Sequence, residues 1–385
     1  MTDQAPTNGT IGHVVREYLP RSATFIYTVL RHQRGFAPVV FAKRAMNLDE
    51  FPLDDVRHLT PMEPVLHRAR RKGTALASGY TGTYPHRIAT HARSEGCVAL
   101  HAHFGWSGVA AVPAAKRLDI PLVTTFYGRD LSDPERANSR RSPHRRLFAE
   151  GTLFMCEGPA MAKHLGETGC PPERIRIQRI GLDVSRWPFD PPVRRRPLII
   201  VQISRFVEKK GLDLSLRAFA AARDELGPSE LWMVGDGRLR EDLEALAARL
   251  GIAEHVHFLG MVSYSEYQEV MRRAHICLQP SRTARDGDTE GGAPTVLLEM
   301  QAAGIPVVST RHADIPFVVA DPGELVEEED VEGISDALIR VAGLSDADWQ
   351  ERARRGRAVV QERHDAATLA SKLDEIYAEA LRLHG

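Results

Sequence analysis

The sequence has few cysteines, few aromatic residues and no long apolar run. Its 385 residues are 6% aromatic and include four cysteines, Cys97, Cys156, Cys170 and Cys277, none of which forms a C-x-x-C pair. This scatter disfavours a zinc site or a disulfide framework and favours four buried thiols in a reducing compartment. No apolar run approaches the roughly 18–20 residues that cross a membrane. The first ten residues also lack the basic and apolar blocks of a signal peptide, so we expect a cytoplasmic protein.

The sequence also lacks an excess of charge of either sign. Lys and Arg number 50, Asp and Glu 51, and the net charge of −1 disfavours a nucleic-acid-binding protein. The first 190 residues nevertheless hold 26 basic and 18 acidic residues, a net +8, and the rest hold 24 and 33, a net −9. Basic runs at 68–72 and 140–146 carry much of this excess, without aromatic residues that would stack on single-stranded nucleic acid. They are either a solvated face or a surface for an anionic acceptor or the inner face of a membrane.

Short apolar runs alternate with helical patterns along the whole chain. The expected strands are at 39–41, 98–100, 122–123, 198–201, 231–234, 256–259, 276–278 and 306–308. Helical spacing of apolar residues marks 211–226 and 238–251, and the last stretch, about 366–385, is amphipathic. This alternation predicts an α/β protein with parallel sheets covered on both faces. The segment Trp187–Pro197 has four prolines in eleven residues and predicts a stiff connector between domains 1–188 and 189–365.

Cationic side chains follow the first expected strand of the second half. Arg205, Lys209 and Lys210 lie after it, and Gly211 precedes the helix. A planar guanidinium and an ammonium point charge beside a helix N-terminus suit the oxygens of a diphosphate. These side chains could instead be solvated cations of a surface loop. The turn at Met233–Gly237 permits either close approach of a ligand or a plain strand-to-helix connection.

An acidic, glycine-rich segment, Asp286–Gly292, precedes a helix that begins near Pro294. A proline suits a first turn, and free N–H groups at a helix start favour an anion. Glu299 lies in this helix, where its carboxylate could accept two hydrogen bonds from a ribose diol. Glu290 lies before the helix, where it could reach a sugar hydroxyl or a developing charge, although either glutamate could be solvated. The string Asp286-Gly287-Asp288 matches the metal-binding pattern D-x-D, but its position beside Glu290 favours a role in the loop.

In their order and spacing these segments resemble glycosyltransferase family 4, the retaining nucleotide-sugar enzymes of GT-B fold. The resemblance covers most of the chain and is strongest over 201–319, where R-F-V-E-K-K-G, V-G-D-G, F-L-G and E-G-G-A-P-T-V-L-L-E occur in family order. Within the family, the chain looks most like bacterial exopolysaccharide enzymes of the colanic acid type. The implied fold is GT-B, with two Rossmann-like, doubly wound parallel-sheet domains facing a cleft. The resemblance also implies that the last helix packs back on the first domain.

The resemblance implies a donor site in the second domain and an acceptor site in the first. Arg205 and Lys210 would hold the donor diphosphate. Glu299 would bind the ribose, and Glu290 the donor sugar. Groups near the base and the distal phosphate would be Gly235, Asp236, Gly260, Met261, Val262, Gly291, Gly292, Ala293, Pro294, Thr295 and Val296. The family has seven residues between its two glutamates and this chain has eight, so we expect the extra glycine to bulge the loop.

On the acceptor side, Ser22 stands in a segment resembling the S-E-T-F-I of these enzymes, with Ala23 in place of the family's glutamate. Ser22 either contacts the acceptor or caps the following helix. His103 belongs to a segment resembling H-x-H-F and lies either in the cleft or in a buried, hydrogen-bonded position. We place His101 and His103 on opposite faces of their strand and predict no metal site from the pair.

The segment at 124–130 resembles the family's T-x-H-G-x-D, with Tyr127 at the histidine position and Asp130 retained. A phenol can hydrogen-bond but is a poor general base near neutral pH. We therefore expect an altered acceptor interaction or substrate-assisted chemistry, and retained activity.

The expected reaction is transfer of a sugar, with retention, from a nucleotide-diphosphate sugar to a saccharide or small-molecule acceptor. Arg205 and Lys210 would stabilise the departing diphosphate, which would help to deprotonate the acceptor. We expect no metal and no cofactor beyond the co-substrate, with UDP or GDP as its nucleotide; the acceptor and the oligomeric state stay open. Two alternatives are a sugar-nucleotide 2-epimerase of the same fold and a non-catalytic binding protein, which the cations and both glutamates disfavour.

Overall fold

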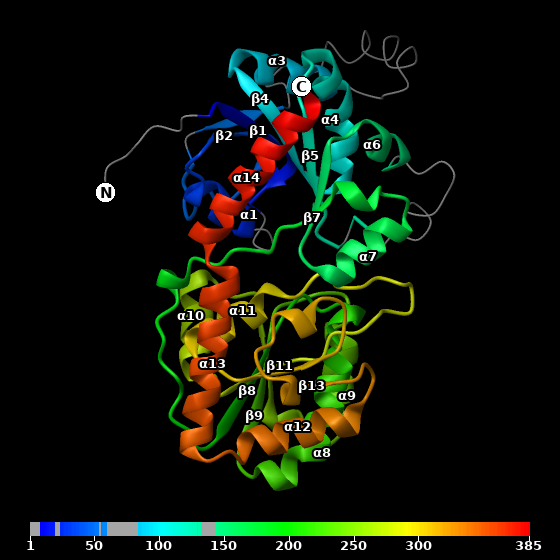
Figure 1. The fold of residues 1–385 in the computed structure, drawn as a ribbon. Coiled ribbons are helices and arrows are strands. Elements are labelled where there is room, and N and C mark those ends of the chain that lie inside the picture. Colours follow the sequence, from blue (N-terminus) through cyan, green and yellow to red (C-terminus); the bar gives the residue numbers. More distant parts are fainter. Residues whose placement is uncertain (1–7, 20–23, 54, 60–83, 129, 132–143) are drawn as a thin grey trace. The chain divides into compact units, whose positions relative to one another are not determined.

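The computed structural model describes residues 8–19, 24–53, 55–59, 84–128, 130–131 and 144–385. The chain divides into two compact units: unit 1, Met1–Gly181 with Ala366–Gly385, and unit 2, Leu182–Asp365. In each unit a central sheet is covered by helices (Figure 1). The crossing from unit 1 to unit 2 falls between Gly181 and Leu182, seven residues before the expected boundary, so the proline-rich segment belongs to unit 2.

Unit 1 is built on a parallel sheet. In the described part of the chain this sheet has seven strands in the order β3-β2-β1-β4-β5-β6-β7. The strands are Thr10–Tyr18 (β1), Ala37–Ala45 (β2), Val56–His58 (β3), Cys97–His103 (β4), Leu122–Thr125 (β5), Leu153–Cys156 (β6) and Ile175–Ile177 (β7). The central strands β1 and β4 are buried over most of their length, as expected where helices cover both faces of a sheet.

The helices of unit 1 cover both faces of that sheet. They are Thr24–His32 (α1), Tyr84–Ser94 (α3), Gly105–Leu118 (α4), His144–Glu150 (α6), Pro159–Glu167 (α7), a 3₁₀ turn at Pro172–Arg174, and Ala366–His384 (α14). Leu100 of β4 packs with residues of α3 and α4, whereas the next-door Ala99 packs with Tyr377 of α14. The last helix of the chain therefore belongs to unit 1, where it lies beside α1 (Figure 1).

Unit 2 is built on a second parallel sheet. Its six described strands lie in the order β10-β9-β8-β11-β12-β13. They are Leu198–Ile203 (β8), Ser229–Val234 (β9), Val256–Gly260 (β10), Ile276–Gln279 (β11), Val307–Thr310 (β12) and Leu325–Val326 (β13). The chain moves outward from β8 to β10 and then returns to the other side of β8 as β11, which creates a topological switch between β8 and β11.

The helices of unit 2 include several with clear sequence signals at their ends. They are Leu212–Leu226 (α8), Arg240–Arg249 (α9), Tyr264–Arg273 (α10), Thr295–Ala303 (α11), Val331–Ala342 (α12) and Asp346–His364 (α13), with 3₁₀ turns at Val184–Arg186, Glu208–Lys210, Ala253–His255, Ile315–Phe317 and Pro322–Glu324. Helix α10 begins with a capping box in which Ser263 and Glu266 each bond the other's backbone N–H. Residues of α8, α9 and α12 form one core with the strands.

The α/β class and the two parallel sheets are confirmed, and the runs expected as strands lie in β2, β4, β5 and β8 to β12. The helix expected at 211–226 is α8, and the one expected at 238–251 is α9. In the described ranges of the chain, no helix combines the length and the apolar character needed to span a bilayer.

Candidate functional site

The carboxyl ends of β8 and β11 lie side by side in unit 2. The loop after β8 carries Arg205 and Lys210, and the loop after β11 carries Glu290. Open α/β sheets bind ligands in the crevice that such a switch leaves at the carboxyl ends of its strands. The fold thus brings together residues 80 positions apart, as the sequence predicts.

Gly211 allows these two loops to approach closely. Its φ of +60° lies in the left-handed region, and a Cβ there would be 1.9 Å from the carbonyl oxygen of Pro280. Only glycine fits both the space and the backbone conformation. The approach places the 3₁₀ turn that ends at Lys210 against the chain leaving β11.

Lys210 and Glu290 form a buried ion pair. The Lys210 Nζ donates to Glu290 Oε1 at 2.8 Å and Oε2 at 2.7 Å, and Ser281 Oγ donates to Oε1 at 2.6 Å. Burial alone would raise the pKa of Glu290, but the charges of Lys210 and Lys209 outweigh it and lower that pKa. An ammonium has three N–H donors, so Lys210 keeps one for a further acceptor.

Lys209 has a different role from its neighbour. Its side chain is buried, and Nζ donates to Asp288 Oδ1 at 3.0 Å and to the Thr289 carbonyl oxygen at 2.7 Å. Asp288 N also donates to Asp286 Oδ1 at 3.0 Å. The acidic loop is therefore held by Lys209 and by a hydrogen bond within the loop.

Arg205 is exposed, and within the described ranges its guanidinium has no hydrogen-bond or ion-pair partner. Burial of Lys210 is the main cause that lowers the pKa of this lysine, and the nearby positive charge of Arg205 lowers it further. A planar fork with five N–H donors is thus available beside the Lys210–Glu290 pair. This edge of the sheet presents unpaired positive charge in a unit whose half of the sequence is acidic.

Glu299 lies on α11 and is held by Tyr267 of α10, whose hydroxyl donates to Glu299 Oε2. Burial raises the pKa of Glu299, opposed by this hydrogen bond. Its other oxygen, Oε1, has no hydrogen-bond partner among the residues that the structure describes. One face of the carboxylate therefore remains for a hydroxyl group, as the ribose hypothesis requires.

The turn after β9 is tied to the end of β10. Gly235 N donates to the Gly260 carbonyl oxygen at 2.9 Å. A Cβ on Gly235, whose φ is +126°, would lie 1.9 Å from the Ser204 carbonyl oxygen. Asp236 is exposed in this turn, and Met261 after β10 is 64% exposed. These residues line the same end of the sheet as Arg205, and Val262 follows them in the chain.

Helix α11 begins beside the Glu290 loop. No side chain caps it: Pro294 is the N-cap and Thr295 the first residue. Its first N–H groups lack intrahelical partners, as in every α-helix. Gly291 has a φ of +77° and donates its N–H to Thr289 Oγ1 at 3.1 Å. The segment predicted to cover the distal phosphate is Gly291, Gly292, Ala293, Pro294, Thr295 and Val296.

The sequence reasoning missed two groups that support Glu290. His312 follows β12, is 2% exposed, and accepts the Glu290 backbone N–H at Nε2 over 3.1 Å. Its Nδ1 must then carry the proton, which it donates to Glu328 Oε1 at 2.7 Å. Ser281 is the second group. Both lie at carboxyl ends of neighbouring strands, a position that could have revealed them.

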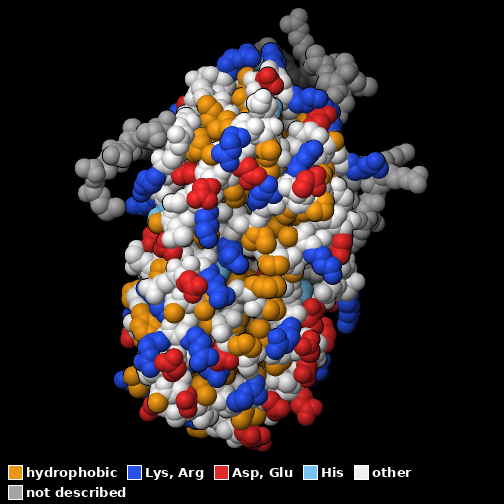
Figure 2. Space-filling view, viewed as in Figure 1, with side chains coloured by type: hydrophobic (Ala, Val, Ile, Leu, Met, Phe, Trp, Pro, Cys, Tyr) orange, Lys and Arg blue, Asp and Glu red, His pale blue; other side chains and the backbone are white. Residues whose placement is uncertain are grey.

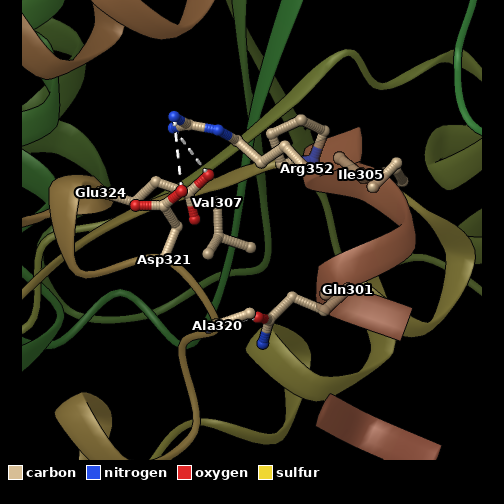
Figure 3. Close-up of a pocket in the computed structure, with 10 residues that line it drawn as sticks. Gln301, Ile305, Val307, Ala320, Asp321, Glu324 and Arg352 are labelled. Atoms are coloured by element: carbon tan, nitrogen blue, oxygen red, sulfur yellow. Dashed lines mark hydrogen bonds and ion pairs between the residues drawn. The ribbon is translucent and has the colours of Figure 1, made fainter. Parts of the chain in front are cut away.

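A small pocket elsewhere in unit 2 contains none of the expected donor residues (Figure 3). Its volume is about 10 Å³, room for about one water molecule. Arg352 in its wall pairs with Glu324 at 3.1 Å and with Asp321 at 3.4 Å. The polar groups of this pocket are matched to one another, so it is a packing feature and not a substrate site.

In unit 1, Asp130 organises the ends of β4 and β5. Its Oδ2 accepts the Gly105 N–H at 2.6 Å, at the start of α4, and its Oδ1 accepts the Tyr127 N–H at 3.1 Å. Asp130 is 6% exposed, and burial raises its pKa to about 6 against these hydrogen bonds. It is therefore a positioning residue for Tyr127, whose pKa burial raises well above the usual phenol value.

His103 is 1% exposed and contacts the Tyr127 side chain. Its Nδ1 and the Tyr127 hydroxyl are 2.8 Å apart. The expectation that His101 and His103 lie on opposite faces of the strand is wrong, since their ring centroids are 4.2 Å apart. Residues two apart on a strand share a face. Both side chains lie on the face that Ala99 also occupies, which α14 covers.

Some sequence expectations fall outside the described residues. These are Ser22 with its neighbour Ala23, the basic run at 68–72, and residues 140–143 of the second run. The rest of that run lies in α6, which begins at His144. On the face shown in Figure 2, Lys and Arg side chains are interspersed with Asp and Glu over both units.

Two sequence-family models match the chain, one mainly in unit 1 and the other within unit 2. "Glycosyltransferase Family 4" matches residues 23–186, and "Glycosyl transferases group 1" matches residues 197–343. Both models describe glycosyltransferases, and together they span most of the chain. The predicted resemblance of the chain to glycosyltransferase family 4 is thereby confirmed.

Relatives and a solved structure agree with this assignment. WcaL of Escherichia coli K12, named for colanic acid biosynthesis, is 34% identical over 69% of this chain and 65% of its own length. The amylovoran biosynthesis glycosyltransferase AmsK of Erwinia amylovora is 32% identical over 62% of this chain and 60% of its own. The chain thus spans less than two thirds of either relative. Anabaena HepE, solved with UDP and glucose, is 16% identical with a TM-score of 0.74, covering 96% of this chain and 99% of HepE, which supports the GT-B fold.

Proposed function

We propose that this protein transfers a sugar from a nucleotide-diphosphate sugar to a hydroxyl of a saccharide or small-molecule acceptor, with retention at the anomeric carbon. The observation that carries the proposal is Arg205, which is exposed and has no side-chain partner among the described residues, beside the Lys210–Glu290 pair at the switch of the unit 2 sheet. One guanidinium and one remaining ammonium N–H suit a diphosphate. The relatives named for polysaccharide biosynthesis support a saccharide acceptor.

In the proposed reaction the bond between the anomeric carbon and the diphosphate oxygen breaks, and the acceptor oxygen bonds to that carbon on the same face. The acceptor proton moves to the departing phosphate. Arg205 and Lys210 stabilise the negative charge that develops on the leaving group. This chemistry asks for no metal, because the two cations supply the compensating charge.

Glu290 and Glu299 orient the donor in this proposal. Glu290 is fixed by Lys210, Ser281 and the His312 backbone contact, so its carboxylate is held rigidly near the sugar. Glu299 offers its unpartnered oxygen to the ribose. We propose UDP or GDP as the nucleotide; HepE is solved with UDP, and a mannosyltransferase of Mycolicibacterium smegmatis, 33% identical over 169 residues, is named for GDP-mannose.

Thermal shift with UDP-, GDP-, ADP- and dTDP-sugars tests the donor. A ligand that binds the folded state raises the melting temperature, and at a given concentration a tighter ligand raises it more. We expect one nucleotide series to stabilise the protein, and no stabilisation by any would contradict the proposal. NMR of that donor with and without saccharide acceptors then tests the reaction. A product with the donor's anomeric configuration supports transfer, whereas an epimer formed from the donor alone supports the epimerase instead.

A further inference from the structure

A buried group of three histidines in unit 1 has no part in the donor site. His13 of β1 stands opposite His101 of β4 in the sheet register, and His103 lies two residues further along β4. Their exposed fractions are 0%, 2% and 1%. One ring nitrogen of each lies within 4.8 Å of the others, the one group of this kind among the described residues.

The spacing of these nitrogens approaches that of a tetrahedral metal site. His13 Nδ1 and His103 Nε2 are 3.1 Å apart. Two imidazole ligands at about 2.0–2.1 Å from a tetrahedral zinc ion are separated by roughly 3.3 Å. The two nitrogens therefore need to part by only a few tenths of an ångström. His101, whose ring centroid is 4.2 Å from that of His103 and 5.1 Å from that of His13, supplies the third position.

The surroundings supply the outer contacts that metal-bound histidines use. A ligating imidazole normally holds a partner on its other nitrogen, which orients the ring. His103 Nδ1 contacts the Tyr127 hydroxyl at 2.8 Å. His101 contacts both the Tyr377 hydroxyl and Thr125 Oγ1 at 2.7 Å, so one of these remains when the other nitrogen ligates.

The other nitrogen of His13, Nε2, is buried and meets no hydrogen-bond geometry with the described residues. The Gln33 side chain lies beside His13 and is the polar group nearest to hand for that ring or for the ion. A histidine ligates a metal through the lone pair of a neutral ring nitrogen. Imidazole ligands suit zinc among the divalent ions.

We propose that His13, His101 and His103 bind one zinc ion within unit 1, with a water molecule or Gln33 as the fourth ligand. The ion links β1 to β4 and fixes the tautomer of His103, so that Nδ1–H donates to the Tyr127 hydroxyl. Its role is structural, and the sugar transfer stays metal-free. The sequence analysis predicted no metal site from His101 and His103 alone, and it did not include His13.

Zinc stoichiometry of the full chain tests this proposal. The protein is treated with a chelator, desalted, incubated with zinc chloride, passed again through a desalting column and assayed by elemental analysis. We expect one zinc per chain, a higher melting temperature than the chelated protein, and visible absorbance typical of tetrahedral coordination when cobalt(II) replaces zinc. Retention of no zinc by the wild-type chain, or no such cobalt absorbance, would overturn the proposal.

Substitutions assign the ion to the cluster. His13→Gln and His103→Gln should each abolish zinc retention, whereas His86→Gln on the exposed face of α3 should retain it. Tyr127→Phe removes only the outer contact of His103 and should weaken zinc binding about 10–100-fold. Unchanged retention in folded His13→Gln and His103→Gln, judged by circular dichroism, would place zinc elsewhere and refute the assignment. If those variants do not fold, the cobalt spectrum and Tyr127→Phe decide. Nucleotide binding should not change on zinc removal, which separates this result from the donor proposal.

Discussion

The carboxyl ends of the strands differ between the two sheets. The buried polar side chains there are charged and paired in unit 2, whereas in unit 1 the histidines and tyrosines are neutral. In unit 2, Lys210 pairs with Glu290 and Lys209 pairs with Asp288, so charges are matched and Arg205 is left over. In unit 1, burial keeps the histidines and tyrosines neutral. The first arrangement suits an anion, and the second suits neutral hydroxyl groups. This difference supports the proposal that unit 2 binds the diphosphate and that unit 1 binds the acceptor.

The largest expected effect is that of Lys210→Ala. The variant loses a donor to the leaving group, for which about 10²–10³-fold in kcat is typical of such groups. It also leaves Glu290 buried without its cation, at about 3–5 kcal/mol of stability. Steady-state kinetics and urea unfolding measure the two losses.

The double variant Lys210→Met/Glu290→Gln separates these causes. It removes both buried charges, so stability should recover substantially while activity stays low. A double variant as unstable as Lys210→Ala would contradict this explanation. It would mean that the packing of the lysine side chain, and not the unpaired charge of Glu290, causes the loss of stability. Arg217→Ala on the exposed face of α8 is the control for loss of a positive charge.

Asp130→Asn tests the polar groups of unit 1 through the pH dependence of protein stability. Because burial raises the folded pKa of Asp130 to about 6, its contribution to stability is present below pH 4 and is lost as pH rises to about 6. The change amounts to about 3 kcal/mol over that range. The variant should lack this slope in urea unfolding measured from pH 4 to 7. Parallel pH profiles for both proteins would show that Asp130 does not titrate as expected.

Glu299→Gln should weaken nucleotide binding by about tenfold, because a hydrogen bond to a charged acceptor becomes one to a neutral amide. Pyrophosphate, which lacks the ribose, should bind equally to wild type and variant. Calorimetric titration of both ligands measures the difference, with the exposed Glu254→Gln as the charge control. A matching loss for pyrophosphate would exclude a specific ribose contact.

The smallest effect is expected for Tyr127→Phe. Loss of one neutral hydrogen-bonding hydroxyl corresponds to about 0.5–1.5 kcal/mol, so acceptor use should fall by less than about tenfold and donor affinity should not change. Kinetics at varied acceptor concentration, beside donor titration, measures this. A complete loss of turnover would mean that the phenol takes part in the chemistry.

The gathering of the candidate donor residues at one edge of the sheet was predictable from sequence, because these residues follow strands within short, ordered motifs. Arg205 and Lys210 follow β8, and Glu290 and Glu299 flank the start of α11. Parallel strands place such segments at one edge whatever the distance along the chain. The exposure of Arg205 and the pairing of Lys210 with Glu290 could not be predicted from the sequence. Either Lys209 or Lys210 could have paired with Glu290.

Other features could not be read from local sequence. Tyr267 joins the site from α10, and no motif marks it, whereas His312 could have been suspected only from its place after β12. His13 lies in β1 without any pattern that links it to His101, so the three-histidine group emerged only from the strand register. The placement of His101 and His103 on opposite faces was a misjudged strand period, not a tertiary effect.

The central claim is that Arg205 at the unit 2 edge binds the donor diphosphate. Calorimetric titration of the stabilising nucleoside diphosphate into wild type, Arg205→Ala and Arg217→Ala tests it most directly. We predict at least tenfold weaker binding in Arg205→Ala, since one charge-assisted contact is worth about 1.5–3 kcal/mol, with Arg217→Ala equal to wild type. Equal affinity in all three proteins would contradict the account.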